Sequence, residues 1–217
     1  LKNLMLLLQA RKFDSVMQQT SSLLEKFPES TSLIAVRGAA HIALREYEKA
    51  IALYKKSILL QPKNPESYFN LGNAFKEKGD LNSAILNYKR AIEIRPNFVE
   101  AHNNLGNIFE DQSDIDAAIS SYENAIKIKP EYADALNNLA NLYMEKGNLE
   151  TSVDTFKKSL KVSPNNSRTL FNLANALTKK GETLKAIQLY EKAVFISPGY
   201  AEAYNNLGNA QMREEDL

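Results

Sequence analysis

Proline recurs at one fixed interval along this 217-residue chain. Six prolines stand 34 residues apart: Pro28, Pro62, Pro96, Pro130, Pro164 and Pro198. Self-similarity at a constant period of this length is typical of a repeat solenoid. A unit of this size has room for two helices of about three turns each and two short turns. The chain is therefore predicted to be a stack of helical hairpins, with about thirteen antiparallel helices and no sheet.

The chain divides into units when each phased proline is taken as the third residue from a unit's end. Five full units result: 31–64, 65–98, 99–132, 133–166 and 167–200. Residues 1–30 correspond to a partial, divergent unit, and residues 201–217 to the first helix of a truncated one. Because each unit packs mainly on its neighbours, 1–217 is predicted to be a single array without one central core.

The last four residues predict that the second helix of the final unit is absent. Glu214, Glu215, Asp216 and Leu217 align with Lys78–Leu81, where the turn between two helices is expected. The helix before them is then expected to keep an open apolar face. We therefore expect the chain to be a fragment that self-associates through its open C-terminal end.

The residues of one unit form an amphipathic pattern. Tyr68, Leu71 and Phe75 recur at three- and four-residue steps, which places them on one face of a first helix. Gly72 falls in the middle of this helix, where glycine costs about 1 kcal/mol relative to alanine. Glycine or alanine at this position in successive units predicts a close helix–helix contact that admits no larger side chain.

Glycines and polar residues mark the turn within each unit. Gly79, Gly147 and Gly181 stand where the first helix ends and suit the left-handed residue that follows a helix. Asp80 and Asn148 come next and are predicted N-caps of the second helix.

This pattern resembles the tetratricopeptide repeat (TPR). The resemblance is carried by Leu71, Gly72, Phe75, Gly79, Ala84, Tyr88, Ala91 and Pro96 and by their counterparts in neighbouring units. Local departures include Arg45 and Ser113 at the turn and His41 at an aromatic position. The resemblance implies an all-α, right-handed αα superhelical solenoid of helix-turn-helix repeats, whose first helices line a concave groove.

Two rows of asparagine lie in register on the predicted first helices. The rows are Asn70, Asn104, Asn138, Asn172 and Asn206, and, three residues on, Asn73, Asn107, Asn141, Asn175 and Asn209. Residues three apart share a helix face. The amide is donor and acceptor together, so a row of amides along a groove suits an extended peptide held by its backbone. The other interpretation is that the amides bond between neighbouring helices, and the sequence leaves both open.

Charges along the predicted groove change sign toward the C-terminal units. Glu77, Asp111 and Glu145 stand near the ends of first helices, and Lys179 and Arg213 take the same position later. Solvated helix termini account for charges of this kind. A mildly acidic middle groove that prefers neutral or basic peptides is the functional alternative.

Composition removes several classes of function. The net charge is +1 and no cluster of basic residues interleaves with aromatics, so neither nucleic acid nor a membrane is an expected partner. The absence of cysteine excludes disulfides and thiol catalysis and suits a reducing cytoplasm. His41 and His102 are the only histidines, and both fall on packing positions. Without metal-ligand spacing, a phosphate loop or a nucleophile–base pair, no cofactor, metal site or catalytic residue is expected in this chain.

Two functional classes remain. One is an interaction module that binds an extended peptide or a partner protein in the groove. The other is the substrate-recruiting arm of a larger glycosyltransferase or sulfotransferase, with the catalytic domain beyond Leu217. The Asn-Asn-Leu-Gly-Asn strings at 103–107 and 205–209 resemble those in the TPR arm of protein O-linked N-acetylglucosamine transferases, and bacterial TPR-fused transferases are similar. The sequence does not decide between the two.

Overall fold

The computed structural model describes residues 1–215, which form thirteen α-helices and no strand. In chain order the helices are α1 (Lys2–Gln9), α2 (Phe13–Lys26), α3 (Thr31–Ala43), α4 (Tyr47–Leu60), α5 (Pro65–Lys78), α6 (Leu81–Ile94), α7 (Val99–Asp111), α8 (Ile115–Ile128), α9 (Ala133–Glu145), α10 (Leu149–Val162), α11 (Ser167–Lys179), α12 (Thr183–Ile196) and α13 (Ala201–Glu215). The all-α class predicted from the proline period is confirmed.

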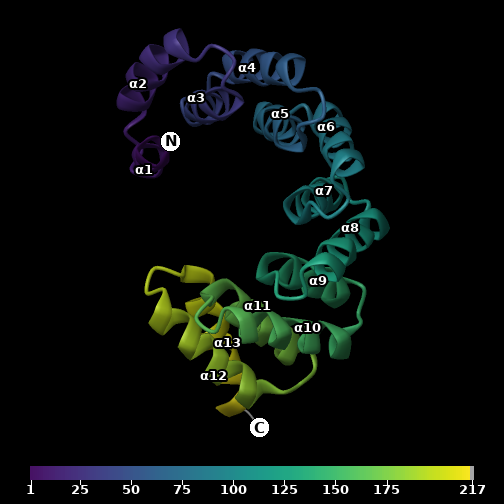
Figure 1. Ribbon diagram of the computed structural model, residues 1–217. Helices are drawn as coiled ribbons and strands as arrows, with labels where there is room; N and C mark the ends of the chain where they lie inside the picture. Colours follow the sequence, from purple (N-terminus) through teal and green to yellow (C-terminus); the bar gives the residue numbers. More distant parts are fainter. Residues whose placement is uncertain (216–217) are drawn as a thin grey trace. The chain divides into compact units, whose positions relative to one another are not determined.

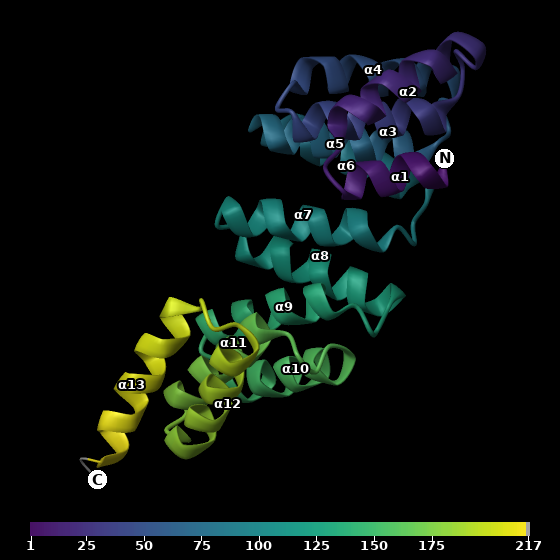
Figure 2. The ribbon, with the colours of Figure 1, turned by 90° about the vertical axis from the view of Figure 1, so that its left-hand side faces the viewer.

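Two compact units divide the chain, Leu1–Ile108 and the remainder from Phe109. Within each unit, consecutive helices form antiparallel hairpins, and each hairpin packs on the next (Figures 1 and 2). The α5–α6 pair is one such hairpin in the first unit, and the α11–α12 pair is one in the second. Apolar surface is thus buried between adjacent hairpins, as in a solenoid.

The turn inside each hairpin has one residue in the left-handed region. The three predicted turn glycines have positive φ: Gly79 at 90°, Gly147 at 79° and Gly181 at 82°. Arg11, Arg45 and Ser113 adopt φ of 56°, 60° and 61° at the equivalent positions. A side chain in this conformation costs roughly 1–2 kcal/mol. The repeat geometry therefore imposes the same turn even where the sequence lacks glycine, including the divergent unit at 1–30.

The helix N-termini only partly follow the capping predictions. Oδ1 of Asp80 accepts a hydrogen bond from the Ser83 backbone N–H at 3.0 Å, as predicted for the start of α6. Asn148 occupies the N-cap position of α10, but its side chain makes no capping hydrogen bond. Asp114 caps α8 with a 3.2 Å bond from the Ala117 N–H, which the sequence analysis did not single out.

The mid-helix glycine of α5 stands against a buried tyrosine of α6. A Cβ atom added to Gly72 would lie 2.7 Å from Cε1 of Tyr88, which is 0% exposed. Gly38 is placed in the same way against Tyr54. The prediction of a close helix–helix contact at this glycine is confirmed, and its cause is an aromatic ring lying directly on the helix backbone.

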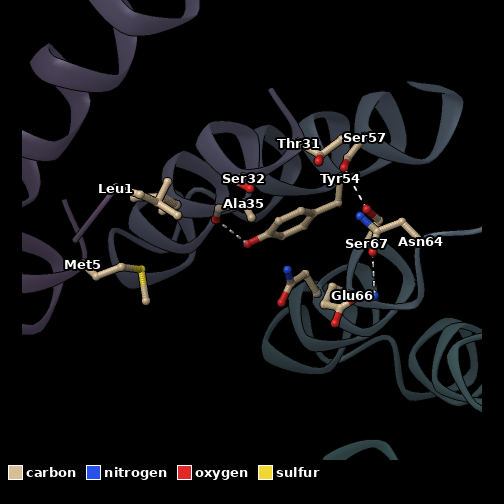
Figure 3. Close-up of a pocket in the computed structure, with 12 residues that line it drawn as sticks. Leu1, Met5, Thr31, Ser32, Ala35, Tyr54, Ser57, Asn64, Glu66 and Ser67 are labelled. Carbon is tan, nitrogen blue, oxygen red and sulfur yellow. Dashed lines mark hydrogen bonds between the residues drawn. The ribbon is translucent and has the colours of Figure 1, made fainter. Parts of the chain in front are cut away.

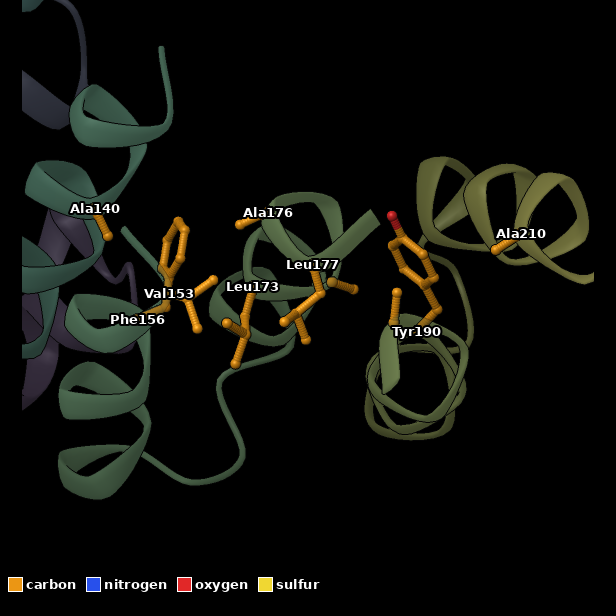
Figure 4. Close-up of a cluster of buried hydrophobic side chains, with 10 residues drawn as sticks. Ala140, Val153, Phe156, Leu173, Ala176, Leu177, Tyr190 and Ala210 are labelled. Atoms are coloured by element: carbon orange, nitrogen blue, oxygen red, sulfur yellow. The ribbon is translucent and has the colours of Figure 1, made fainter. Parts of the chain in front are cut away.

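The second unit has the same type of interface. Figure 4 shows Phe156 of α10 and Tyr190 of α12 lying on either side of Leu173 and Leu177 of α11. Ala210 of α13 closes the far side of this cluster. Large rings and small alanines alternate, so the helices approach closely with few voids.

His41 is a packing residue, as predicted. Its side chain is buried, and Nδ1 lies 2.6 Å from Oε2 of Glu46. Hydrogen bonds, first from Lys49 and then from His41, lower the pKa of the Glu46 carboxyl. Among residues 1–215, no helix combines the length and apolar composition needed to cross a bilayer.

The C-terminal turn differs from the prediction. Glu215, which aligns with Gly79, is the last residue of α13 rather than a turn residue. In the other units the hairpin is held by a second helix packing back on the first, and no helix follows α13 in the described residues. Asp216 and Leu217, also assigned to this turn, lie outside the described residues.

Candidate functional site

The ten predicted site asparagines all lie on first helices, in α5, α7, α9, α11 and α13. We call the surface of these helices that carries them the first-helix face. Nine of the ten side chains are half-buried, and Asn209 is exposed. Most of these amides therefore have protein on one side and solvent on the other.

In the first unit, three side chains join two consecutive repeats. The Tyr88 hydroxyl donates to Oδ1 of Asn73 at 2.6 Å. Nδ2 of Asn104, in the next repeat, donates to the same oxygen at 3.0 Å and to the Tyr88 oxygen at 3.3 Å. We call this arrangement the Asn–Tyr–Asn cluster. It links α5, α6 and α7.

The cluster recurs in the second unit. The Tyr190 hydroxyl donates to Oδ1 of Asn175 at 2.6 Å, and Nδ2 of Asn206 donates to the same oxygen at 2.8 Å. Two separate repeats thus have the same geometry at the same spacing. For these residues the structure shows the inter-repeat hydrogen bonds of the second interpretation.

Other repeats depart from the cluster: the Tyr122 hydroxyl donates to Oε2 of Glu110 at 2.6 Å, and the next repeat has no tyrosine at this position. Phe156 stands where Tyr88 and Tyr190 stand in their repeats, so no hydroxyl is available there. Nδ2 of Asn172 then donates to Oδ1 of Asn137 at 3.3 Å, and Asn141 makes no side-chain hydrogen bond in the described part of the chain. Where the hydroxyl is absent, Asn172 therefore bonds to Asn137 and not to Asn141.

Burial keeps these tyrosines in the neutral, donating form. Desolvation is the main cause that raises the pKa of Tyr88 and of Tyr190 above their usual value of 10.0. A hydrogen bond with Asn104 or Asn206 opposes this rise. The Asn oxygen of each cluster therefore faces a proton donor over the physiological pH range.

Asn70 lacks the partner that its counterparts have. In the preceding repeat Ala39 stands where Asn73 and Asn175 stand in theirs, and the Tyr54 hydroxyl donates instead to the Ala35 carbonyl at 3.3 Å. The Asn70 amide makes no hydrogen bond within the described residues. Both its donor and its acceptor are free for another molecule.

Asn70 lines a hollow of about 320 Å³ between α1, α3 and α5. Figure 3 shows the Tyr54 ring of α4 across its base, with Met5 of α1 and Leu1, the residue before α1, on one side. Val36 adds a further apolar wall. The hollow thus has an apolar side, formed by Met5 and Val36 among others, and a polar side of hydroxyls, Glu66 and the Asn70 amide.

Hydrogen bonds and an ion pair fix the rest of this hollow. The hydroxyls of Ser57 and Ser67 lie 2.7 Å apart and join α4 to α5 (Figure 3). Oε1 of Glu66 lies 2.9 Å from the Arg95 guanidinium. These contacts hold the wall on which Asn70 stands.

The structure assigns no metal site to the residues it describes, since no group of three His, Asp or Glu side chains is arranged to hold an ion there. His102, the second histidine, has Nε2 at 3.0 Å from the Pro96 carbonyl. It therefore joins the start of α7 to the turn before it.

Comparison with known families gives a direct match over most of the chain. A family model described as "TPR repeat" matches residues 38–79, 72–113 and 106–147, and one described as "Tetratricopeptide repeat" matches residues 131–196. The chain belongs to the tetratricopeptide repeat family. The array assigned from the proline period is thus a TPR array.

Known TPR proteins share its sequence or its fold. The probable UDP-N-acetylglucosamine–peptide N-acetylglucosaminyltransferase SEC of Arabidopsis thaliana is 32% identical over 72 residues, which is 33% of this chain and 7% of that protein. The Cut9–Hcn1 hetero-tetramer of the APC/C matches 97% of this chain and 42% of its own chain, at TM-score 0.77 and 16% identity. YrrB, described as a TPR protein with an unusual peptide-binding site, matches 86% of this chain and 96% of its own, at TM-score 0.66 and 18% identity. The chain spans a small part of the first relative and less than half of the second.

Sequence reasoning did not find the Asn–Tyr–Asn cluster or the hollow at Asn70. The signal for the cluster was present, because Asn73, Tyr88 and Asn104 stand 15 and 31 residues apart and the spacing recurs at Asn175. The signal for the hollow was Ala39, which stands one repeat before the start of the second asparagine row.

Proposed function

We propose that this TPR array is a protein-interaction module that binds an extended peptide, or an extended segment of a partner protein, along its first-helix face. The observation that carries the proposal is the Asn70 amide, which has no partner within the described residues and lines a hollow with one apolar and one polar side. We infer that the chain itself acts by binding and that any chemistry lies elsewhere.

The hollow has room for one side chain of a peptide ligand together with one of the ligand's backbone peptide groups. The Asn70 amide can donate to a backbone carbonyl and accept from a backbone N–H whatever side chain the peptide carries. Val36 and Met5 offer apolar surface to a neighbouring side chain of the ligand. Such a site favours a short apolar motif in extended conformation.

We expect the other predicted asparagines to contribute less to peptide binding than Asn70. Nδ2 of Asn104 and of Asn206 is already engaged with the preceding repeat, which leaves the Oδ1 of each to accept from a ligand N–H. Asn141 and Asn209 make no side-chain hydrogen bond within the part of the chain that the structure describes, so each keeps its whole amide for a ligand. YrrB supports peptide binding on this fold through its described peptide-binding site.

A peptide-array screen followed by two alanine variants tests the proposal. For a peptide that binds the chain, Asn70→Ala is expected to weaken binding by about tenfold, which corresponds to about 1.4 kcal/mol. Its melting temperature should be retained, because alanine favours helix and no internal hydrogen bond is lost. Asn104→Ala is the contrast for stability only and is expected to lower the melting temperature, because Asn104 donates to Asn73 and Tyr88. Unchanged binding by the Asn70 variant for every array hit would refute the assigned role of this hollow.

A second candidate function is supported by the match to the N-acetylglucosaminyltransferase. In this proposal the array recruits substrate proteins for a transferase domain in the same polypeptide. The gene sequence downstream of Leu217 tests it directly. A glycosyltransferase or sulfotransferase domain in that reading frame is the expected result, and a stop codon shortly after Leu217 would remove this candidate.

Self-association is proposed for the outer face of α13. Tyr204 is 48% exposed and Met212 60% exposed there, and no heavy atom lies within 4 Å of a Cβ built on Gly208. Tyr204→Lys combined with Met212→Lys should then reduce any concentration-dependent dimer seen by sedimentation. A dimer that persists in this variant would place the contact elsewhere.

A further inference from the structure

The outer face of α13 carries the same kinds of residue in both directions from Gly208. Tyr204 and Met212 stand four residues before and after this glycine, and Asn205 and Gln211 stand three residues before and after it. Residues three and four apart lie on one face of a helix. We call these five residues the α13 stripe. A large apolar side chain and an amide thus lie on each side of a central glycine.

The α13 stripe lines one open hollow of about 440 Å³, together with Asn209. Ala203 and Ala210, on the opposite side of the helix, are buried in apolar clusters with residues of α11 and α12. No heavy atom lies within 4 Å of a Cβ built on Gly208. Within residues 1–215 the centre of the stripe therefore faces open space.

The corresponding face of α5 is covered by the second helix of its own hairpin. Gly72 has the place in α5 that Gly208 has in α13, and the Tyr88 ring of α6 lies against it. Glycine at this position thus admits a side chain of another helix close to the backbone. At Gly208 the same space is free for a side chain from elsewhere.

One residue of the α13 stripe departs from the faces that second helices cover. Phe75 of α5 and Leu177 of α11 correspond to Gln211, and both pack in apolar clusters. Gln211 is polar and exposed. Interfaces between separately folded proteins are about as polar as the rest of the surface, whereas the covered faces of this array are apolar. An amide at this position therefore suits a contact that is partly open to water.

We propose that the α13 stripe pairs with the same stripe of a second copy of this chain, in antiparallel orientation, about a two-fold axis at Gly208. The inference rests on the proposed self-association of α13 and names its geometry. In a two-fold contact, residue i of one copy meets residue j of the other, and j meets i. With Gly208 on the axis, Tyr204 meets Met212 of the second copy, and Asn205 meets Gln211 of the second copy.

Each of these pairs is chemically matched. A methionine sulfur packs favourably against an aromatic ring, which suits Tyr204 with Met212. The amides of Asn205 and Gln211 are each donor and acceptor, so they can hydrogen-bond to one another. Gly208 has no side chain to hold the two backbones apart. In the antiparallel orientation the N-terminus of each helix also lies beside the C-terminus of the other, which the helix dipoles favour.

The competing explanation is that the α13 stripe is an ordinary solvated helix face. Single apolar side chains on a protein surface are common. That explanation predicts a monomer at every accessible concentration. Because one pair of helices buries less area than a stable interface needs, the pairing predicts a weak dimer that forms with rising concentration.

Sedimentation equilibrium of the full 217-residue chain is the first test. We expect a monomer–dimer equilibrium with a dissociation constant in the micromolar range. A chain that remains monomeric up to about 1 mM would overturn both the inference and the proposed self-association, and would leave the stripe to a different helix.

The same substitution at two glycines tests the position of the axis. Gly208→Gln is expected to weaken the dimer by at least about tenfold, because a long side chain on the axis separates the two backbones. Its melting temperature, measured where the chain is monomeric, should be retained or raised, since glutamine favours helix over glycine. Gly199→Gln is the matched control, because Gly199 is exposed, has no heavy atom within 4 Å of its Cβ position and precedes α13. It should leave the dimer unchanged.

A pair of charge variants tests the orientation. Asn205→Lys with Gln211→Glu keeps the net charge and sets a lysine opposite a glutamate twice in the antiparallel dimer. We expect the dimer to tighten by about threefold or more at about 0.05 M salt. In a parallel dimer like charges would meet, so the same variant would weaken it. Asn205→Lys with Gln211→Lys sets like charges opposite one another in the antiparallel dimer and is expected to weaken it.

The remaining outcomes separate the inference from the proposed self-association. Self-association of α13 stands, and the antiparallel register is overturned, if Tyr204→Lys with Met212→Lys abolishes a dimer that Gly208→Gln leaves unchanged. Weakening by the Lys–Glu variant also overturns the antiparallel orientation alone. A dimer that none of the α13 variants affects overturns both, because the contact then lies on another surface.

Discussion

Tyr88 donates a 2.6 Å hydrogen bond to Oδ1 of Asn73, and the same oxygen accepts from Asn104 of the following repeat. A residue of a second helix thereby fixes an amide of its own first helix in the orientation that the next repeat requires. The bond is local within one hairpin, but its effect is on the contact between hairpins.

Removing the hydroxyl at this interface should destabilise the array. Tyr88→Phe keeps the ring but leaves Asn73 and Asn104 with one bond fewer each, and a net hydrogen bond contributes roughly 0.5–1.5 kcal/mol. We expect a free energy of unfolding lower by about that amount for each lost bond in urea titration. No change in the denaturation midpoint would show that the cluster contributes nothing to stability.

Adding a hydroxyl where the cluster is broken should be tolerated. Phe156 is 0% exposed, and a buried hydroxyl without a partner costs roughly 1–3 kcal/mol. At this position Asn141 and Asn172 flank the ring in the way that Asn175 and Asn206 flank Tyr190. Phe156→Tyr is therefore expected to fold with equal or greater stability by calorimetry, whereas a loss of more than about 1 kcal/mol would contradict it.

Two glycines at equivalent positions should respond in opposite directions to alanine. Gly72→Ala places a methyl group 2.7 Å from the buried Tyr88 ring, and overpacking of this kind costs roughly 1–3 kcal/mol. At Gly208 no heavy atom lies within 4 Å of the added Cβ, so alanine should gain up to about 1 kcal/mol of helix propensity. Thermal unfolding of both variants measures this difference. A similar response at the two sites would mean that the ring does not restrict the glycine.

Glycine at the irregular turns should stabilise the array. Ser113 has φ of 61° and Arg45 has φ of 60°, both in the region where side chains are strained. Ser113→Gly and Arg45→Gly are each expected to raise the free energy of unfolding by about 0.5–1 kcal/mol, since relief of strain exceeds the entropy that glycine loses. Lys146→Gly is the control, because Lys146 has φ of −72° and glycine there should destabilise.

The sequence predicted the architecture because the fold depends on a short set of periodic positions. Pro62, Gly79 and Tyr88 each mark one feature of the unit, and their recurrence gave the helix number and the hairpin arrangement. At Arg45 and Ser113 the array imposes a left-handed turn conformation that is unfavourable for a residue with a side chain.

Side-chain partners were harder to predict, because each depends on the neighbouring repeat. The role of Asn104 is set by Asn73 and Tyr88, and the freedom of Asn70 is set by Ala39. The positions of one asparagine row look identical in the sequence, although the hydrogen-bond partners of their side chains differ.

Ala39 stands where later repeats have asparagine, and its small side chain leaves the Asn70 amide without its usual internal partner. Each Asn–Tyr–Asn cluster needs three residues from two successive repeats, and the loss of one releases an amide that the helix backbone still holds in place. One point mutation can therefore turn a structural amide into one exposed to ligands, and the reverse change, Ala39→Asn, can restore the internal bond.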